Sequence, residues 1–509
     1  MFVPALLILL VGLIIYYVRR SHTYWRRHGV TEIYPIHPIF GNARETFLCN
    51  ESIYEFFLRI YSIFKAKRVR YGGIYTFTAR ALVIIDPELI KDIMQTSFDH
   101  FEDRAGYINE EREPLTAHLV NLKGAKWKSM RHRLTPTFTS GKMKMMFQTF
   151  VYCISGLKGM IEGYARNKES VDIKDVLARF TTDIIGNCAF GIECNSMKDP
   201  SSEFRVYGKK VFDRNFWQNA KITMTRFVPK SVINALGIYV TNQEVAQFFT
   251  RMITSTIEYR EKNNIARRDF LDMLLQLKNH GQLKNDDGVF EQTGVDGSLT
   301  LNQIAAQCFV FFLAGFETSS TAMTFALYEL SRNQVVQDKL RQEINRVLRK
   351  HDGEITYEAV QEMTYLENVI YESMRKFPPV PAVPRTCTKT YRVPNSNVVI
   401  EKGKMVNIPI AGLHWDPDYF PDSEKFDPDR FTEEIKATRP HYAYLPFGGG
   451  PRNCIGLRFG MLQSKVGVAT IIRNFRLTLN SKTEHPLRYE TGSFITSVKG
   501  DVWLDVERV

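Results

Sequence analysis

The chain has 509 residues and carries 67 Lys and Arg against 55 Asp and Glu, a formal net charge of +12 that suits an anionic membrane, a nucleic acid or an acidic protein partner. Its hydrophobic content of 44% and charged content of 24% are those of a globular protein and exclude the fibrous and disordered classes. Its seven cysteines are widely spaced and include no CxxC pair, which argues against a disulfide framework or a zinc module and favours a reducing compartment.

The N-terminal stretch "MFVPALLILLVGLIIYYV" carries no charged side chain and is followed by Arg19, Arg20, Arg26 and Arg27. Its length is just sufficient to cross a thin bilayer such as that of the endoplasmic reticulum. Because neither the charged start nor the small-residue cleavage site of a secretory signal is visible, we expect residues 1–20 to be an uncleaved membrane anchor. The arginines after the apolar run predict that the rest of the chain stays on the cytosolic side.

The stretch at 21–42 is basic and contains prolines, and we expect it to be a linker between the anchor and the body of the chain. After it, "IYTFTARALVIIDPELI" predicts two short strands and a helix that begins at Asp86-Pro87. The pattern is mostly helical from about 140 to 280, with a break near "RFVPKSVINALGIYV".

Residues 282–300 are polar and contain glycines, and they predict a surface loop. Helical patterns resume from 301 to about 376. Prolines, short strands and loops then lead to a last helix after Cys454 and a strand-rich tail. The sequence therefore predicts a mainly α fold with small β-sheets.

The loop "PFGGGPRNCIGLRFG" places one thiol, Cys454, among glycines directly before a helix-like run. Cysteine is a nucleophile or a metal ligand only as the thiolate. The nearby helix N-terminus and the positive charges of Arg452 and Arg458 favour the thiolate, and the glycines permit close approach of something flat. On these residues alone, Cys454 is a packed inert thiol, a nucleophile that needs a histidine base, or a ligand of an iron cofactor.

The pattern Phe447-x-x-Gly450-x-Arg452-x-Cys454-x-Gly456 resembles the haem-binding signature of cytochrome P450, the haem-thiolate monooxygenases. The resemblance implies that Cys454 is the axial ligand of a haem b iron. It also implies that Gly456 lets the new helix pass close to the porphyrin and that Phe447 packs near the sulfur. The fold that it implies has a long central helix over the haem.

Residues 301–331 form a long apolar run that predicts a buried helix, and Thr300 with Gln303 predicts a capping box at its start. A carboxylate and a hydroxyl at Glu317 and Thr318, in the middle of this helix, are costly to bury without partners. On the residues alone, a hydrogen-bonded structural pair explains them as well as a functional pair does.

The string Ala314-Gly315-x-Glu317-Thr318 is similar to the oxygen-activating segment of the same family. The resemblance implies that Gly315, beside Ala314, opens a groove over the haem for dioxygen. It implies that Thr318 and Glu317 deliver protons in catalysis.

Trp127 and Arg131 in "AKWKSMRHR" lie four residues apart, on one face of a predicted helix. Unaided, this is a basic surface helix with one buried tryptophan, but the pattern resembles the family helix that binds a haem propionate. Arg385 and Arg452 match further propionate partners, and the guanidinium fork suits carboxylates.

Glu372 and Arg375 lie one helical turn apart, and most such pairs are solvated surface contacts. Together with Arg430 they are similar to the structural Glu-Arg-Arg triad of the family. The matched motifs run from 127 to 456 and one haem must touch all of them, so we expect a single haem-binding catalytic domain at 43–509.

A basic face is expected on the thiolate side, where the alternative is a solvated surface. The resemblance implies that an acidic, NADPH-dependent flavoprotein reductase docks there, with cytochrome b5 as a further electron donor. No nucleic-acid recognition motif is visible. The basic residues concerned are Lys126, Lys128, Arg133, Arg458 and Lys465.

Segments 101–122, 309–316, 380–383 and 491–497 are expected to line a pocket for lipophilic molecules, although core packing is the preferred explanation for Phe311. The break near residues 227–239 is expected to face the membrane and offer such molecules an entry.

The combination of "AGFETSS", the thiol loop and the anchor is most similar to the microsomal insect family-six branch, which handles foreign compounds such as plant toxins and insecticides. The implied reaction inserts one oxygen atom of O2 into lipophilic small molecules by hydroxylation, epoxidation or dealkylation. Alternatives are oxidation of endogenous lipids or hormones by the same chemistry, a reductase-independent haem-thiolate isomerase, a haem sensor without turnover, or an anchored cysteine hydrolase.

Overall fold

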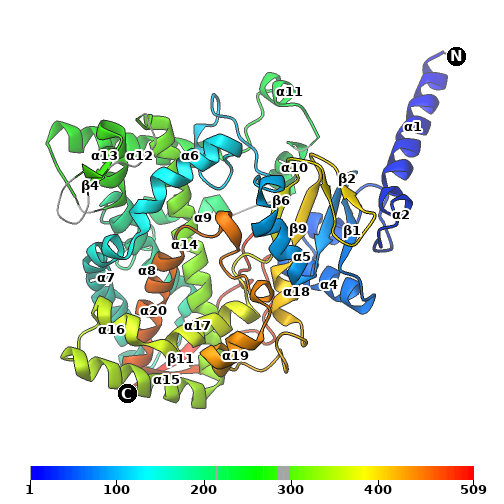
Figure 1. Ribbon diagram of the computed structural model, residues 1–509. Coiled ribbons are helices and arrows are strands. Elements are labelled where there is room, and N and C mark those ends of the chain that lie inside the picture. The colour runs from blue at the N-terminus through cyan, green and yellow to red at the C-terminus, as the bar shows by residue number, and fades with distance from the viewer. Residues whose placement is uncertain (1, 213–215, 226, 268, 285–289, 292–297) are drawn as a thin grey trace. The chain divides into compact units, whose positions relative to one another are not determined.

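The computed structural model describes residues 2–212, 216–225, 227–267, 269–284, 290–291 and 298–509 (Figure 1). The chain divides into two compact units. Unit 1 comprises Met1–Ala105, Val380–Ser423 and Arg439–Asn453, and unit 2 comprises Gly106–Pro379, Glu424–Thr438 and Cys454–Val509. Helices predominate and the sheets are small, as the sequence predicts.

Unit 1 is built around a four-stranded sheet of order β1-β2-β9-β6. β2 pairs antiparallel with β1 and parallel with β9, and β9 pairs antiparallel with β6. The strands of unit 1 are β1 (Tyr71–Thr76), β2 (Ala79–Ile84), β6 (Val383–Thr386), β7 (Tyr391–Arg392), β8 (Val399–Ile400) and β9 (Met405–Ile408). Its α-helices are α1 (Phe2–Ser21), α2 (Tyr24–Arg27), α3 (Arg44–Phe47), α4 (Ile53–Ala66), α5 (Pro87–Lys91) and α18 (Ile410–Trp415).

Local sequence explains where α5 of unit 1 begins. The side chain of Asp86 caps α5, because its Oδ1 accepts a hydrogen bond from the amide of Leu89 at 2.8 Å, and Pro87 occupies the first turn. The two predicted strands and the helix start at Asp86-Pro87 are therefore confirmed.

The stretch predicted as a linker packs into unit 1 instead of standing apart from it. Tyr24, Trp25, Val30 and Ile33 are buried in the same hydrophobic cluster as the strands β1 and β2. The division of the chain at residues 20 and 42 stays a prediction.

Unit 2 is mainly helical. Its α-helices are α6 (Gly124–Leu134), α7 (Ser140–Asn167), α8 (Ile173–Ile185), α9 (Glu203–Phe212), α10 (Phe216–Met224), α11 (Lys230–Ala235), α12 (Gln243–Lys262), α13 (Phe270–His280), α14 (Leu301–Arg332), α15 (Gln334–Leu348), α16 (Tyr357–Glu362), α17 (Thr364–Lys376), α19 (Glu433–Thr438) and α20 (Leu457–Asn474). Its strands are β3 (Val171–Asp172), β4 (Leu283–Lys284), β5 (Phe290–Glu291), β10 (Phe475–Leu479) and β11 (Trp503–Arg508).

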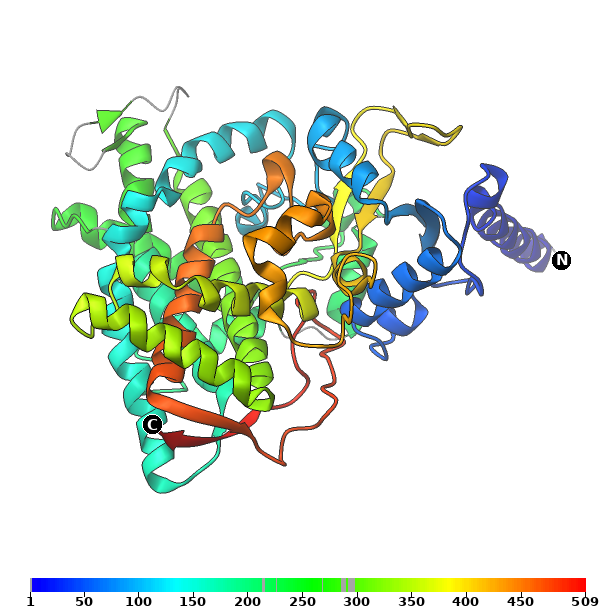
Figure 2. The same ribbon diagram turned by 60° about the horizontal axis from the view of Figure 1, so that its bottom comes forward.

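The helix α14 runs through the core of unit 2 (Figure 1). It packs against α8, α17 and α20, and Figure 2 shows α20, which itself packs against α7 and α15. The predicted capping box is present, since Thr300 Oγ1 accepts from the amide of Gln303 at 3.2 Å and Gln303 Oε1 accepts from the amide of Thr300 at 3.0 Å. Among the described residues, α14 is the one helix long and apolar enough to cross a membrane by length and composition, and it is mostly buried.

Two predicted irregular regions contain regular structure. The break near 226–240 includes the short helix α11, and the predicted loop at 282–300 includes the two-residue ladder of β4 and β5. Residues 226, 285–289 and 292–297 of these regions lie outside the described residues.

The predicted triad in unit 2 forms as expected. Arg375 donates from Nε to Glu372 Oε2 at 2.7 Å and from Nη2 to Glu372 Oε1 at 3.0 Å, and Arg430 Nε lies 3.5 Å from Glu372 Oε1. The amide of Asp427 also donates to Glu372 at 2.9 Å, so the triad ties α17 to the segment that holds Arg430.

Candidate functional site

The predicted site residues are divided between the two units. Unit 1 holds Arg385, Phe447 and Arg452. Unit 2 holds Trp127, Arg131, Ala314, Gly315, Glu317, Thr318, Cys454 and Gly456.

In unit 2, the thiol of Cys454 lies near the cation of α6. Cys454 is exposed, three residues before α20 begins. Burial lowers the pKa of Arg131 below its ordinary value, and the charge interaction with Cys454 opposes that shift. Trp127, on the same helix, is buried. Arg131 therefore interacts with the sulfur through its charge, and a cation nearby favours the thiolate. The predicted role of Trp127 and Arg131 as propionate partners stays a prediction.

The start of α20 lies against the 3₁₀ turn Thr135–Phe138. Arg458 Nη1 donates to the carbonyl of Phe138 at 3.4 Å, and a Cβ added at Gly456 would lie 3.8 Å from the Phe138 ring. Glycine at 456 is thus not required by protein contacts within this unit, and its role beside a porphyrin stays a prediction.

The middle of α14 is open in an otherwise buried helix. Residues 304–312 and 319–331 are buried, whereas Ala314 is exposed and Gly315 and Thr318 are partly exposed. A Cβ at Gly315 would approach Ile185 to 2.7 Å, so the glycine also allows α14 to pack closely on α8. Thr318 Oγ1 donates to the carbonyl of Ala314 at 2.5 Å, which fixes the hydroxyl one turn back along the helix.

Glu317 faces a cluster of cations. Burial raises its pKa above the ordinary glutamate value, and the charges of Lys174, Arg205 and Lys209 together with a hydrogen bond to Ser497 oppose the rise. Because desolvation is the largest influence, the carboxyl keeps its proton at a higher pH than an exposed glutamate does. The carboxyl is thus suited to hold and release a proton.

In unit 1, the buried Arg385 and Arg452 lie close to the partly buried Arg104. Arg385 has no solvent exposure, donates from Nη1 to the carbonyl of Pro384 at 3.0 Å, and keeps Nε and Nη2 without a hydrogen-bond partner. Burial lowers the pKa of Arg385 well below its ordinary range, and repulsion from Arg104 and Arg452 lowers it further. Arg452 lies 3.7 Å from Asp103 Oδ1, and Arg104 Nη2 donates to the carbonyl of Arg452 at 2.8 Å.

This cluster fits a group with more than one carboxylate. Buried donors without partners are costly, and guanidinium groups bind carboxylates through parallel hydrogen bonds. A haem carries two propionates, which the donors of this cluster in unit 1 match. Taken by itself, unit 2 offers a thiol beside Arg131 and the open turn of α14.

One glycine of the thiol loop, Gly450, is required by the backbone of unit 1. Gly450 has a φ of +65°, and a Cβ there would lie 1.8 Å from the carbonyl oxygen of Met94. Only glycine fits such a position. The half-buried Phe447 lies in the same unit, and its predicted packing near the sulfur stays a prediction.

The aromatic side chains of α14 divide into core and pocket candidates. Phe311 packs edge to face on Phe270 with ring centroids 4.1 Å apart, which confirms core packing. Phe309 and Phe312 are also buried and pack on Phe249, so they belong to the core as well.

Three aromatic rings from different parts of unit 2 meet near the open turn of α14. The ring of Phe212 lies 6.0 Å from that of Phe316 and 5.9 Å from that of Phe494. Phe494 is partly exposed. These rings are candidates for an apolar pocket wall.

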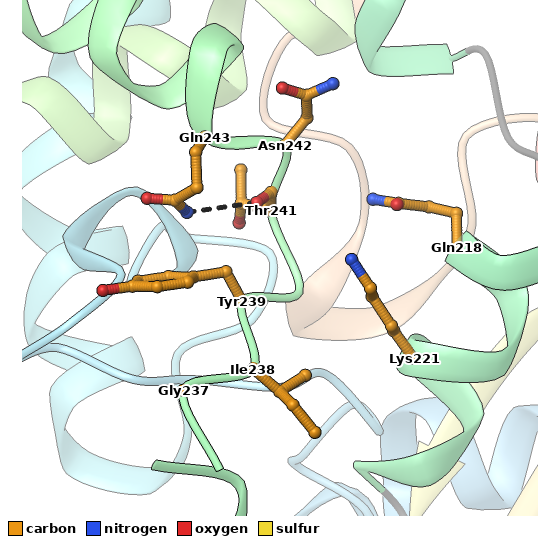
Figure 3. Close-up of a pocket in the computed structure, with 8 residues that line it drawn as sticks. All are labelled: Gln218, Lys221, Gly237, Ile238, Tyr239, Thr241, Asn242 and Gln243. Carbon is orange, nitrogen blue, oxygen red and sulfur yellow. Dashed lines mark hydrogen bonds between the residues drawn. The ribbon is translucent and has the colours of Figure 1, made fainter. Parts of the chain in front are cut away.

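A separate hollow of about 420 Å³ lies between α10 and the start of α12 (Figure 3). Gln243 Nε2 donates to the carbonyl of Thr241 at 3.2 Å at its edge. The hollow is lined by Gln218, Lys221, Gly237, Ile238, Tyr239, Thr241, Asn242 and Gln243, none of which is a predicted site residue.

Sequence reasoning missed Arg104, Arg205 and Ser497. Arg104 stands in the string "FEDRAG", and Arg205 lies far from Glu317 in the sequence, so no spacing rule links either residue to its cluster. The resemblance could have found Arg104 and Ser497, which belong to segments expected to line the pocket, whereas Arg205 belongs to none of these segments.

One predicted docking residue is wrong. Lys465 is buried on α20 and pairs with Glu367 at 3.2 Å, because α20 is covered by other helices on the side that carries it. Lys126, Lys128 and Arg458 are exposed and Arg133 is partly exposed.

The sequence profile described as Cytochrome P450 matches residues 36–504. Cytochrome P450 6a2 of Drosophila melanogaster is 42% identical over 508 residues, which cover 99% of each chain. Cytochrome P450 6a8 of the same fly is 41% identical over 98% of this chain and 97% of its own. Cytochrome P450 6A1 of Musca domestica is 40% identical over 98% of this chain and 96% of its own.

Proposed function

Because the chain belongs to the cytochrome P450 family of monooxygenases and is of the insect family-six type, we propose that it oxidises lipophilic foreign compounds at the endoplasmic reticulum with electrons from an NADPH-dependent flavoprotein reductase. Members of the family bind haem b through an axial cysteine thiolate and use O2, a small-molecule substrate and a redox partner. The proposal goes beyond family membership in four points: the substrates, the reductase as electron donor, cytochrome b5 as a further electron donor, and the location at the membrane.

Cys454 is the proposed axial ligand, with Arg131 favouring the ionised thiol. Arg385, Arg452, Arg131 and Trp127 would hold the propionates, and Ala314, Gly315, Phe447 and Gly456 would contact the macrocycle. When bound, the haem activates dioxygen so that one oxygen atom enters the substrate. The chain itself contributes binding, orientation and proton delivery.

Glu317 and Thr318 are the proposed catalytic residues. The Thr318 hydroxyl is held on the carbonyl of Ala314, and the adjacent Glu317 keeps its proton more strongly than an exposed glutamate. We expect Thr318→Ala to divert electrons into hydrogen peroxide and to lower product formation. An unchanged ratio of product to NADPH consumed would contradict the proton-delivery role.

Three surfaces support the cellular assignment. Seven large apolar or aromatic side chains of α1 are about half exposed or more, which suits a membrane anchor; they are Leu6, Leu9, Val11, Leu13, Ile15, Tyr16 and Tyr17. Lys128 and Arg458 are exposed cations that suit an acidic reductase, and the exposed Lys126 pairs with Glu110 at 2.6 Å. Exposed apolar residues on and beside α10 and α11 suit entry of lipophilic substrates from the membrane; they are Trp217, Phe227, Val232 and Leu236.

The observation that carries the proposal is the open turn of α14 beside the rings of Phe212, Phe316 and Phe494. The test is turnover of a panel of plant toxins and insecticides by microsomes that contain the full chain and NADPH–cytochrome P450 reductase. Products should require NADPH, O2 and the reductase, and Cys454→Ser should lose both products and the thiolate-type spectrum of the reduced carbon monoxide complex. Conversion of endogenous lipids alone, or turnover that needs peroxide and no reductase, would contradict it.

A further inference from the structure

The chain that leads to Cys454 contains three consecutive glycines, 448–450. Gly448 and Gly450 have φ angles of +71° and +65°, in the left-handed region. Because a glycine backbone has more accessible conformations than that of any other residue, such a run does not hold one conformation by itself. The conformation of residues 445–453, the glycine segment, therefore depends on hydrogen bonds from other parts of unit 1.

Two of these bonds hold the middle and the end of the glycine segment. The Tyr442 hydroxyl hydrogen-bonds to the backbone of Gly450 and donates to Gln95 Oε1 at 2.8 Å. Arg104 Nη2 donates to the carbonyl of Arg452 at 2.8 Å. The residues nearest to Cys454 within unit 1 are thus fixed through their backbone atoms.

His414 holds the start of the glycine segment. The amide of Leu445 donates to His414 Nε2 at 2.9 Å, and the carbonyl of Leu445 accepts from the amide of Gly448 at 3.0 Å. Both His414 and Leu445 are buried. Because an amide N–H can only donate, Nε2 is the acceptor, and the imidazole is neutral with its proton on Nδ1.

The helix that carries His414 is itself fixed. His414 belongs to α18, and a Cβ at Gly412 of this helix would lie 2.1 Å from Tyr61 Cβ, so α18 packs closely on α4. Directly after α18, the carboxylate of Asp416 accepts a hydrogen bond from the Tyr61 hydroxyl and pairs with Lys65 at 2.7 Å. The imidazole is therefore presented from a rigid element.

An imidazole suits this position better than a carboxylate. The ring of His414 lies 4.8 Å from that of Tyr444 and 6.3 Å from that of Phe420, and His414 has no solvent exposure. A carboxylate in such an aromatic surrounding would be a buried charge, whereas a neutral nitrogen accepts the amide of Leu445 without one. The pair thus requires a neutral acceptor of the right reach.

We propose that His414 is a positioning residue for haem ligation. Its neutral imidazole fixes Leu445, so that the glycine segment reaches Cys454 in the one conformation from which the ionised sulfur binds the iron. Cys454 follows Asn453 directly in the chain, and a change in the segment is passed to it through the backbone. The inference rests on the proposed ligation by Cys454.

The test compares three variants of the full-length holoenzyme in membranes. His414→Gln places a neutral amide oxygen as many bonds from the backbone as Nε2 of histidine, whereas His414→Asn places it one bond nearer and out of reach of Leu445. Phe420→Leu is the control, because it removes a fully buried ring beside His414 and leaves the hydrogen bond in place. The measurements are the ratio of thiolate-bound to thiolate-free haem in the reduced carbon monoxide complex, the iron–sulfur stretching band of the ferric protein by resonance Raman spectroscopy, and thermal unfolding.

His414→Asn should lower the ratio of thiolate-bound to thiolate-free haem about tenfold, the effect expected when a buried amide loses its acceptor. Its iron–sulfur band should also shift or broaden. His414→Gln should keep the ratio and the band close to those of the wild type. Phe420→Leu should lower the unfolding temperature and leave both spectroscopic readouts unchanged.

The outcomes separate this inference from the ligation on which it rests. If the wild type has no thiolate-bound complex, the ligation by Cys454 fails and the inference falls with it. If the wild type has it, equal ratios in His414→Asn and His414→Gln, or an equal loss in Phe420→Leu, overturn the inference and leave the ligation standing. If His414→Asn retains no haem, Tyr442→Phe decides, because it removes the bond at Gly450, and a wild-type ratio there would overturn the inference.

Discussion

Arg375 and Arg385 lie close in the sequence and are both fully buried, yet their surroundings differ. Arg375 binds both oxygens of Glu372, at 2.7 and 3.0 Å. Arg385 lies among other arginines, makes one hydrogen bond to a carbonyl and leaves two nitrogens without a partner. Burial alone therefore does not distinguish a structural arginine from a ligand-binding one, but the balance of charge around it does.

The cost of burying a charge explains the difference. A buried charge with a bonded partner is tolerated, whereas one without a partner destabilises the chain by several kcal/mol. A protein keeps such an unbalanced cluster where a ligand supplies the missing charge, as the propionates of a haem would for Arg385.

Removal of the balancing carboxylate should have the largest effect. Glu372→Leu leaves Arg375 and Arg430 buried without an acid, and we expect the free energy of unfolding to fall by about 3–5 kcal/mol. Urea unfolding and the yield of haem-containing protein measure this. The matched control is Lys436→Met, which removes an exposed pair with Glu433 and should change little. A loss no larger than that of the control would mean that the triad is not structural.

Removal of the unbalanced arginine should have the opposite effect on the chain alone. With Arg385→Leu we expect the haem-free chain to be equally stable or more stable by about 1–4 kcal/mol, because a buried charge without an acid is gone. Haem loss to an excess of a haem-scavenging protein should speed up about tenfold or more, since hydrogen bonds to charged groups are worth about 1.5–3 kcal/mol each. Arg385→Lys keeps the positive charge but loses the planar fork of donors. Its rate of haem loss should fall between those of the wild type and Arg385→Leu. A destabilised haem-free chain with unchanged haem retention would make Arg385 structural, like Arg375.

The third prediction concerns one acid among several cations. Burial raises the pKa of Glu317 above its ordinary value although Lys174, Arg205 and Lys209 oppose the rise. If coupled turnover needs the protonated carboxyl, product per NADPH should fall as the pH rises through this raised pKa. Glu317→Gln should remove that limb of the profile and lower product formation roughly 10- to 100-fold.

Stability gives an independent check on Glu317. Because its pKa is raised in the folded chain, the folded state binds the proton more tightly than the unfolded state does. The stabilisation is complete below the ordinary carboxyl pKa and is lost as the pH rises through the raised value. Glu317→Gln should flatten the dependence of the free energy of unfolding on pH in this range. If the variant keeps the slope of the wild type, the raised pKa belongs to another group.

Features set by local sequence could be predicted. The cap at Asp86, the capping box of Thr300 and Gln303 and the pair of Glu372 with Arg375 each depend on residues within one helical turn. The fold class follows from the same local periodicity. The resemblance to a known family supplied the rest of the site, because Arg131 and Cys454 have no sequence spacing that would link them.

Features that depend on long-range contacts could not be predicted. The indole of Trp25 donates to the carbonyl of Ile74 on β1, a contact that no spacing within residues 21–42 indicates. The charge of Arg205 acts on Glu317 only because separate helices pack together. Lys465 lies on a helix that is covered on most sides, where a lysine in a basic string does not mark the surface.

Lys465 provides the smallest expected effect. Its ammonium pairs with Glu367 at 3.2 Å, and burial lowers the pKa of Lys465 below its ordinary value. In its charge balance this pair lies between Arg375 and Arg385, since Glu367 balances the charge of Lys465 but is itself 38% exposed. Lys465→Met fills the same space with an apolar chain, and we expect the free energy of unfolding to change by less than about 1 kcal/mol, because the carboxylate of Glu367 that is left behind is partly exposed and can be solvated by water.

The same variant separates the buried cation from the docking face. Reduction of the haem by the flavoprotein reductase should be unchanged in Lys465→Met, because a buried ammonium contributes little to encounter. Lys128→Glu, on the exposed face of α6, should slow reduction, and the loss should be greater at low salt than at high salt. Slower reduction in Lys465→Met with no change in Lys128→Glu would place the reductase on another face, and the charge around Lys465 would then act on electron transfer rather than on the fold.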